Sequence, residues 1–230
     1  MDLLDIIFPK RCPICDIARN VDETGICPDC KKKVKYVNDP VCKKCGRPME
    51  HGTGLCEWCQ KDQIKFDYGR SLFAYSSVID SVYKFKYMNR APYAKQYAKL
   101  LVEHFREILD KEKVDALIPV PIHKKRLMHR GYNQATELAL EISSLTDIPV
   151  KEHVIIRKKN TKALKYLGKK ERRNSMKKAF IVRENVVDLR RVVIIDDIFT
   201  TGSTINSMAA ELKAEGVKEV LFLTLCRAGI

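Results

Sequence analysis

Two adjacent carboxylates stand at the end of an apolar run and just before a turn rich in hydroxyl groups. Val192 to Ile195 are four β-branched residues in a row, which is typical of a strand buried on both faces of a parallel sheet. Asp196 and Asp197 follow at its carboxyl end, where open α/β sheets bind their ligands. Carboxylates in this position can accept hydrogen bonds from the two hydroxyls of a ribose.

The residues after the carboxylates can bind a phosphate. They offer hydroxyls and backbone N–H groups at the first turn of a helix expected to run to about residue 215, where the helix dipole favours an anion. They are Thr200, Thr201, Gly202, Ser203 and Thr204. A strand ending in a polar turn and a capped helix is the simpler alternative. The complete order of strand, carboxylates, two spacers and turn favours a sugar-phosphate site.

Eight of the nine cysteines form four Cys-x-x-Cys pairs, separated by 11, 11 and 10 residues, a spacing typical of zinc ribbons. The pairs are Cys12/Cys15, Cys27/Cys30, Cys42/Cys45 and Cys56/Cys59. Eight thiolates fill two tetrahedral sites, so we expect two structural Zn²⁺ ions with no open position for catalysis. The simplest arrangement joins consecutive pairs, and an interleaved one also fits the spacing. The ninth cysteine, Cys226, is interpreted as a buried core thiol.

The chain carries a formal net charge of +14, distributed unevenly. Residues 151–191 hold 15 Lys or Arg against four acidic residues, a net charge of +11. Such a run is a solvated surface or a surface for polyanions, such as a pyrophosphate or a nucleic-acid backbone. No apolar run reaches the roughly 18 to 20 residues that span a bilayer. The amino terminus starts acidic, and its apolar stretch is too short for a secretory signal. We therefore expect a cytoplasmic protein.

The order of the elements predicts an α/β fold with a small amino-terminal module. Residues 1–65 hold the cysteine pairs and little other apolar material, so we expect this part to fold by binding metal. Residues 66–230 alternate strands with helices, which predicts a parallel sheet with helices on both faces. The expected strands are 68–75, 116–120, 154–156, 192–195 and 219–225, and the expected helices are 78–87, one after Pro92, 132–145, a short one at 169–177 and 204–215.

A basic segment follows the strand at 116–120 and contains no acidic residue before Glu137. Its cations are Lys124, Lys125, Arg126 and Arg130, and we expect them on a loop ahead of the next helix. An exposed basic turn is the simple interpretation. A loop that leaves the carboxyl end of a parallel strand is also where a pyrophosphate would be held beside the carboxylates.

Four blocks in this order resemble the ComF family of phosphoribosyltransferase-like proteins with an amino-terminal zinc module. They are the four cysteine pairs, IPVPIHKKRLMHRGYNQA, TKALKYLGKKERRNSMKKAF and the Asp-Asp segment ending in TTGST, which is similar to the phosphoribosyl pyrophosphate (PRPP) motif of type I phosphoribosyltransferases. The resemblance implies a type I phosphoribosyltransferase-like domain that binds PRPP with Mg²⁺. It also implies a role in DNA uptake during natural transformation, in the cytoplasm, beside a helicase that draws in single-stranded DNA.

The resemblance implies roles for single residues as well. Asp196 and Asp197 would hold the ribose hydroxyls or Mg²⁺-bound waters and act as the catalytic pair, and Thr200 to Thr204 would hold the 5-phosphate. Lys124, Lys125 and Arg126 would lie near the pyrophosphate. Candidates for contacts from a closing loop or to nucleic acid are Lys165, Arg172, Arg173, Lys177 and Lys178. Thr200 stands where the hypoxanthine and guanine enzymes carry an acidic base, so salvage of those purines is not expected.

Two hypotheses from different classes follow. In the first, the chain binds PRPP and acts in the handling of single-stranded DNA during uptake. In the second, it is an active phosphoribosyltransferase of nucleotide metabolism, displacing pyrophosphate from PRPP through an oxocarbenium-like state. The acceptor, the oligomeric state and the protein partner are not readable from the sequence.

Overall fold

The computed structural model describes residues 11–18, 21–22, 24–52, 54–158 and 179–229. The helix predicted at 169–177 and the candidates Lys165, Arg172, Arg173, Lys177 and Lys178 lie outside these residues. The described helices are α2 (Pro28–Lys31), α3 (Glu57–Lys61), α4 (Ile79–Tyr87), α5 (Tyr93–His104), α6 (Lys124–Arg130), α7 (Gln134–Thr146) and α9 (Ser203–Ala214), with a 3₁₀ turn η1 (Tyr75–Ser77). The strands are β1 (Tyr68–Ala74), β2 (Ala116–Pro119), β3 (Ile155–Arg157), β4 (Phe180–Val182), β5 (Arg191–Phe199) and β6 (Glu219–Arg227).

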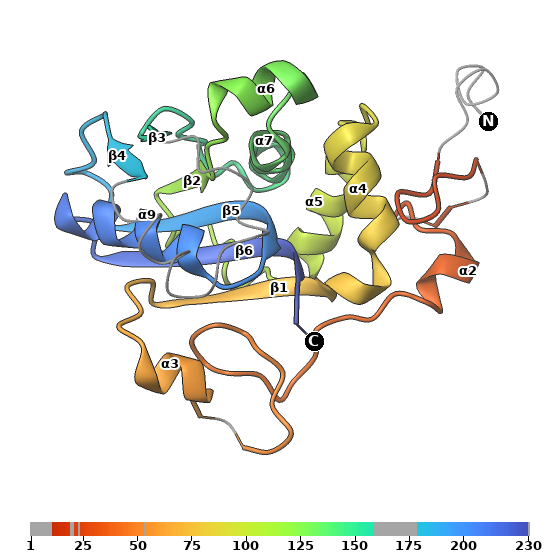
Figure 1. Cartoon of the computed structure of the whole chain (residues 1–230), viewed down its shortest axis with the longest axis horizontal. Coiled ribbons are helices and arrows are strands. Elements are labelled where there is room, and N and C mark those ends of the chain that lie inside the picture. The colour runs from red at the N-terminus through yellow and green to blue at the C-terminus, as the bar shows by residue number, and fades with distance from the viewer. Residues whose placement is uncertain (1–10, 19–20, 23, 53, 159–178, 230) are drawn as a thin grey trace.

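The core is a parallel sheet of four strands in the order β1-β6-β5-β2, as Figure 1 shows. Its two central strands consist largely of buried apolar residues because helices cover both sides of them. The prediction of a parallel α/β sheet is therefore confirmed. In the described part of the chain, no helix combines the length and the apolar content that crossing a membrane requires.

Alternate residues of the strands face two separate hydrophobic clusters, one on each side of the sheet. Val193, Ile195 and Leu221 pack in the cluster that contains the buried residues of α5 and α7. Ile194 and Phe222 pack in the other cluster, with the buried residues of α9. This alternation is the period-2 pattern of a strand, and it confirms helices on both faces.

The strand predicted near Val154 to Ile156 forms as β3, but it does not enter the parallel sheet. It pairs antiparallel with β4, which the sequence analysis did not predict. The free side of β2 is taken instead by the preceding segment. There the Leu117 N–H donates to the Pro149 carbonyl and the Lys151 N–H donates to the Leu117 carbonyl, each at 2.9 Å. The expected fifth parallel strand is therefore reduced to this short contact, and the chain turns away into a hairpin.

The cysteine-rich part lies on both sides of the sheet rather than apart from it. Cys12, Cys27 and Cys30 belong to the cluster of α5 and α7, whereas Cys42 and Cys45 belong to the cluster of α9. The segment between the two groups runs along the outer edge of β1, where the Val37 N–H donates to the Leu72 carbonyl and the Ala74 N–H to the Lys35 carbonyl. In Figure 1, α2 lies beside α4, and α3 lies below β1. The division of the chain near residue 65 stays a prediction.

Candidate functional site

The two carboxylates lie where the neighbouring strand stops. The pairing of β2 with β5 ends at Pro119 opposite Ile195, whereas β6 stays paired with β5 as far as Phe199. The expectation that the strand ends at Ile195 was therefore wrong, because the backbone continues as strand through both aspartates. On the β2 side, however, Asp196 and Asp197 lie beyond the last residue pair of the two strands, so β2 does not pair with the backbone of either aspartate.

The regular alternation of the strand is interrupted at the aspartates. Ile195 and Ile198 pack against the same hydrophobic cluster, although three positions separate them. Ile194 and Phe199 share the opposite cluster, five positions apart. A strict strand would place each of these pairs on opposite faces. The Asp197 N–H also donates to Oδ1 of Asp196 at 2.9 Å, so the first carboxylate bends toward the backbone of the second.

Lys86, near the end of α4, forms an ion pair with Asp197 that sequence reasoning missed. Its Nζ lies 2.8 Å from Oδ2 of Asp197, and the two side chains are only 17% and 11% exposed. Burial by itself lowers the pKa of Lys86, but attraction to Asp197 and then to Asp196 outweighs it, so the pKa is raised. The signal in the sequence is the stretch 81–102, which holds five Lys or Arg and no acidic residue.

Asp196 has an unusual proton affinity. Burial and then repulsion from Asp197 raise its pKa to about 7, and the charges of Lys86 and Arg157 oppose this rise. Arg157 comes from β3, and its guanidinium lies 5.5 Å from the centre of the Phe180 ring. A carboxyl that titrates near neutrality beside a charged neighbour is a frequent feature of ligand sites.

The turn after the carboxylates leads directly into α9 through a glycine in the left-handed region. Gly202 has φ of 70° and precedes α9 as its N-cap residue, a left-handed conformation that favours glycine. The hydroxyls of Thr201 and Ser203 lie 2.7 Å apart, and Thr200 is exposed. No acidic residue stands in the first turn of α9, so its amide groups present a positive potential.

The basic segment is a helix, not the predicted loop. α6 begins after His123, whose Nδ1 accepts a hydrogen bond from the Lys125 N–H at 3.2 Å, and this cap stabilises a helix that has no apolar stripe to reveal it. Lys124 and Lys125 are exposed, and Arg126 is half-buried. Arg126 lies close enough to Arg157 to lower the pKa of that guanidinium, after the larger effect of burial. The segment therefore adds positive potential near Arg157, which in turn interacts with Asp196.

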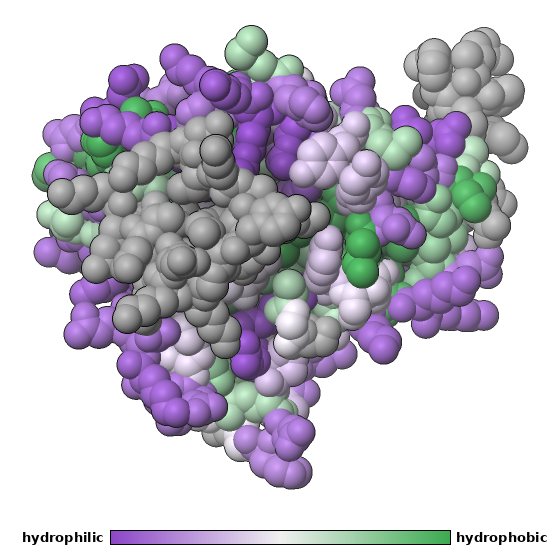
Figure 2. All heavy atoms as spheres, viewed as in Figure 1, coloured by the Kyte–Doolittle hydropathy of each residue, from purple (hydrophilic) through white to green (hydrophobic). Residues whose placement is uncertain are grey.

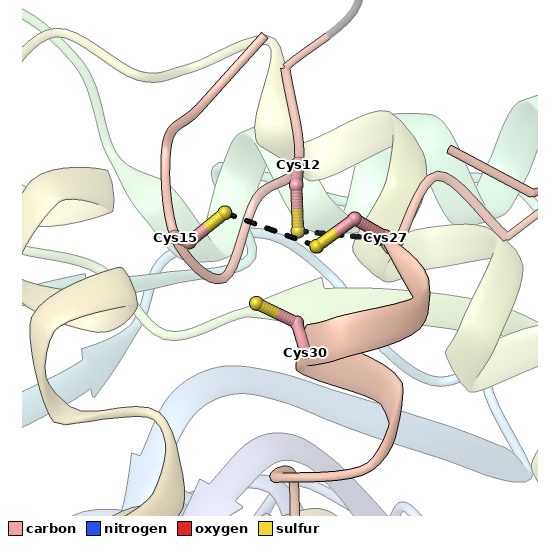
Figure 3. A group of neighbouring side chains, drawn as sticks. All are labelled: Cys12, Cys15, Cys27 and Cys30. Carbon is pink, nitrogen blue, oxygen red and sulfur yellow. Dashed lines mark hydrogen bonds between the residues drawn. The ribbon is translucent and has the colours of Figure 1, made fainter. Parts of the chain in front are cut away.

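The cysteines form two groups in which all four sulfurs lie within 4.8 Å of one another. The first metal unit is Cys12, Cys15, Cys27 and Cys30, and the second metal unit is Cys42, Cys45, Cys56 and Cys59. Figure 3 shows the four side chains of the first unit pointing toward a common centre. Consecutive pairs are thus joined, and the interleaved arrangement is excluded.

The two units share one local design. The Cys27 N–H donates to Sγ of Cys12 at 3.4 Å, and the Cys56 N–H donates to Sγ of Cys42 at 3.2 Å. Four thiolates supported by backbone donors suit a tetrahedral Zn²⁺ with no open position, which is the structural kind of site. Cys226 is fully buried and its thiol donates to the Asp197 carbonyl, so its interpretation as a core residue is confirmed.

Known protein families match both the cysteine-rich part and the α/β part of the chain. Residues 3–60 match the double zinc ribbon domain, and residues 89–230 match the phosphoribosyl transferase domain. Competence protein F of Haemophilus influenzae is 32% identical, covering 96% of this chain and 98% of that protein. DNA utilization protein YhgH of Escherichia coli O157:H7 is 28% identical, covering 96% and 99%. Competence protein ComFC of Bacillus subtilis is 27% identical, covering 94% and 95%.

These matches extend over nearly the whole length of the chain and of each relative. The chain therefore belongs to the phosphoribosyl transferase domain family and, with its double zinc ribbon, to the family of competence protein F.

Proposed function

We propose that the chain binds PRPP at the carboxyl end of β5 and acts in the uptake and handling of DNA. The observation that carries the ligand is the continuous order of Asp196, Asp197 and the Gly202 turn, at the point where the pairing of β5 with β2 has ended. One short segment thus offers acceptors for ribose hydroxyls and donors for a phosphate.

Each part of PRPP has a matching group. Asp196 and Asp197 accept hydrogen bonds from the ribose hydroxyls or from Mg²⁺-bound water, and the amides and hydroxyls from Thr200 to Thr204 hold the 5-phosphate. Lys124, Lys125 and Arg126 neutralise the pyrophosphate, with Arg157 between them and Asp196. The carboxylate pair fits Mg²⁺, which prefers oxygen ligands and would supply charge neutralisation for the pyrophosphate.

Lys86 interacts with both carboxylates in the absence of a ligand. Its ion pair occupies one face of the Asp197 carboxylate, and its charge lowers the pKa of Asp196. A ribose that binds both carboxylates must share Asp197 with this lysine. Lys86 therefore holds the Asp197 side chain in place and opposes protonation of Asp196, which preorganises the acceptors.

The part of the proposal that concerns DNA is supported by the names of the relatives and by one surface. On α4, the exposed rings of Tyr83 and Tyr87 have centroids 5.1 Å apart, and Arg130 lies 4.8 Å from the Tyr87 centroid. Aromatic platforms beside cations are how proteins bind single strands without sequence preference. Figure 2 shows hydrophilic residues gathered over the adjoining α6 at the top of that view. A cytoplasmic location and a helicase partner belong to the same proposal.

Calorimetry with PRPP, with and without Mg²⁺, tests the ligand. We expect saturable binding that requires Mg²⁺ and is lost in the double variant Asp196→Asn/Asp197→Asn. Glu103→Gln/Glu107→Gln, at and just beyond the end of α5, removes two exposed carboxylates away from the site and should bind as the unchanged chain does. Equal binding by the carboxylate variant would contradict the site.

Binding to a fluorescent single strand tests the role in DNA handling. Affinity should fall steeply as salt rises, because phosphate contacts release counterions. Tyr83→Ala/Tyr87→Ala should weaken it about thirtyfold or more, at roughly 1 kcal/mol or more for each of two stacked bases. No binding at low salt would contradict this role.

Turnover is the second candidate function, favoured by the intact carboxylate pair. Its assay is release of pyrophosphate from PRPP in the presence of Mg²⁺ and candidate acceptors. The rate should collapse in Asp196→Asn/Asp197→Asn, and a rate unchanged in that variant would refute an enzymatic role for the site.

A further inference from the structure

The second metal unit touches the turn proposed to hold the 5-phosphate. Trp58 stands in α3 between the metal ligands Cys56 and Cys59. A methyl group built on Gly202 would lie only 2.6 Å from Cη2 of Trp58 and 2.7 Å from Cζ of Phe199. The indole ring therefore packs directly against the backbone of the turn, in the space that only a glycine leaves open.

Trp58 belongs to an aromatic group that continues into the central strands. Its ring centroid lies 6.2 Å from that of Phe199, the last residue of β5, in an edge-to-face arrangement. Phe199 in turn stacks on Phe222 of β6 at 4.8 Å, and Phe66 contacts Trp58, Phe199 and Phe222. Such packing has defined geometry, so a displacement of α3 is transmitted to the residue that precedes the turn.

A buried arginine forms a second link between the unit and the same place. Arg227 ends β6, pairs with Phe199 and is 1% exposed. Its Nη1 donates to the Cys45 carbonyl at 2.7 Å, and its Nη2 lies 3.6 Å from Sγ of Cys45. Its guanidinium also lies 4.5 Å from the centre of the Phe199 ring. The thiolates of a loaded unit thus provide negative charge for a buried cation that rests on Phe199.

We propose that the second metal unit positions the phosphate-binding turn through Trp58 and Arg227, so that its metal and a phosphorylated ribose strengthen each other's binding. The inference rests on the proposed function for the identity of the ligand, and its mechanical part stands on the contacts alone. Trp58 and Arg227 are positioning residues, because they contact the turn and the strand before it rather than the sugar.

The first experiment measures the turn without any ligand. Amide hydrogen exchange is followed at residues 200–206 in the zinc-loaded full chain, in the chain treated with a chelator, and in Trp58→Leu. We expect exchange to be at least fivefold faster in the last two, because the support of the turn is lost. Tyr36→Leu is the matched control, since Tyr36 is a half-buried aromatic residue that packs on Phe73 and His104 instead. Equal exchange in the loaded chain and in Trp58→Leu would overturn the proposal.

The second experiment measures the linkage to the ligand. Calorimetry with PRPP and Mg²⁺ should show affinity about tenfold weaker in Trp58→Leu and within twofold of the unchanged chain in Tyr36→Leu, a coupling of usual size for linked sites. By the reciprocity of linkage, PRPP should raise the affinity of one of the two zinc sites about tenfold, as measured by equilibrium competition with a chelator. Wild-type affinity in Trp58→Leu would overturn the inference while the proposed function stands. If the unchanged chain does not bind PRPP, the proposed ligand fails, and the exchange experiment alone decides the positioning role.

Discussion

The two metal units have the same ligands and the same internal hydrogen bonds, yet they attach to the domain in different ways. The first is held by polar contacts to α4, α5 and the turn between them, where Asp16 binds Arg90 and Tyr93, and Ser81 donates to the Pro13 carbonyl. The second is held by Arg227 and by aromatic packing of Trp58. Ligand spacing therefore determines the metal site, whereas the residues around it determine what the site supports.

The two attachments lead to different parts of the candidate site. From the first unit, Lys84 reaches the Cys15 carbonyl, and two residues later on α4 Lys86 binds Asp197. From the second unit, Trp58 reaches Gly202 directly. The first unit thus connects to Asp197 through α4, and the second contacts the turn at Gly202 directly.

The largest expected effect separates the units by removing one metal at a time. Cys30→Ser and Cys59→Ser occupy matching positions in α2 and α3. Each should lower the zinc content from two ions to one, because a site that loses one of its four thiolates binds zinc far more weakly. Elemental analysis measures this. Cys226→Ala is the matched control and should keep both ions. If both variants lost PRPP affinity to the same extent, the two units would not differ in what they support.

The second test removes Lys86, the residue by which α4 contacts Asp197. Lys86→Met should destabilise the fold by about 2 kcal/mol at pH 8, because it leaves the Asp197 carboxylate partly buried without its cation. Adding Asp197→Asn should recover most of that loss, and urea unfolding of the single and double variants measures it. Independent, additive losses would show that the pair is not coupled.

The stability of the fold should also depend on pH, because Asp196 titrates differently in the folded and unfolded states. Its pKa is raised to about 7 by burial first and by Asp197 second, so the folded state holds a proton that the unfolded chain loses near pH 4. Stability should therefore fall as pH rises from about 4 to about 7. In Asp196→Asn that slope should be smaller, and in Lys86→Met the fall should continue above pH 7, because Lys86 lowers this pKa.

A third test measures the contact between Trp58 of the second metal unit and Gly202. Gly202→Ala should cost about 2 kcal/mol, because the residue has φ of 70° and its new methyl meets Trp58. Gly216→Ala is the matched control: it is also in the left-handed region, at 105°, but open space surrounds the position. In a Trp58→Leu background the cost of Gly202→Ala should shrink by about 1 kcal/mol. An unchanged cost there would mean that backbone strain alone explains it.

The smallest effect concerns the polar anchor of the first unit. Asp16→Asn should cost about 1 to 2 kcal/mol at pH 7, because it weakens charge-assisted hydrogen bonds from Arg90 and Tyr93. Burial raises the pKa of Asp16, but these bonds outweigh it and the pKa is lowered. The stabilisation is therefore present above about pH 4 and is lost as pH falls through the lowered value. Thermal unfolding at pH 7 and pH 2.5 checks this, and a difference that persists at the lower pH would contradict it.

The features that sequence predicted well are those encoded locally. The two-residue spacers identify the four Cys-x-x-Cys pairs, and the strand, carboxylates and turn occupy consecutive positions. Which pairs share a site is decided by the positions of the sulfurs and not by the spacing. Lys86 and Trp58 were missed because their partners are distant in the chain, 111 and 144 residues away. The sequence predicts a loop where α6 forms, because most residues of this segment are polar. The cap of the helix depends on the ring of His123, which is not a usual capping residue. The interrupted alternation at Asp196 depends on packing from both clusters, which no local pattern records.

Both borders of the parallel sheet are already occupied within the chain. Residues 149–151 cover β2, and residues 35–37, which join the two metal units, cover β1. An uncovered strand border pairs readily with the same border of another molecule. Because ordered metal units hold the covering segment of β1 at both of its ends, stripping the metal would leave this strand open, and the metal-free protein would be prone to aggregate through its sheet.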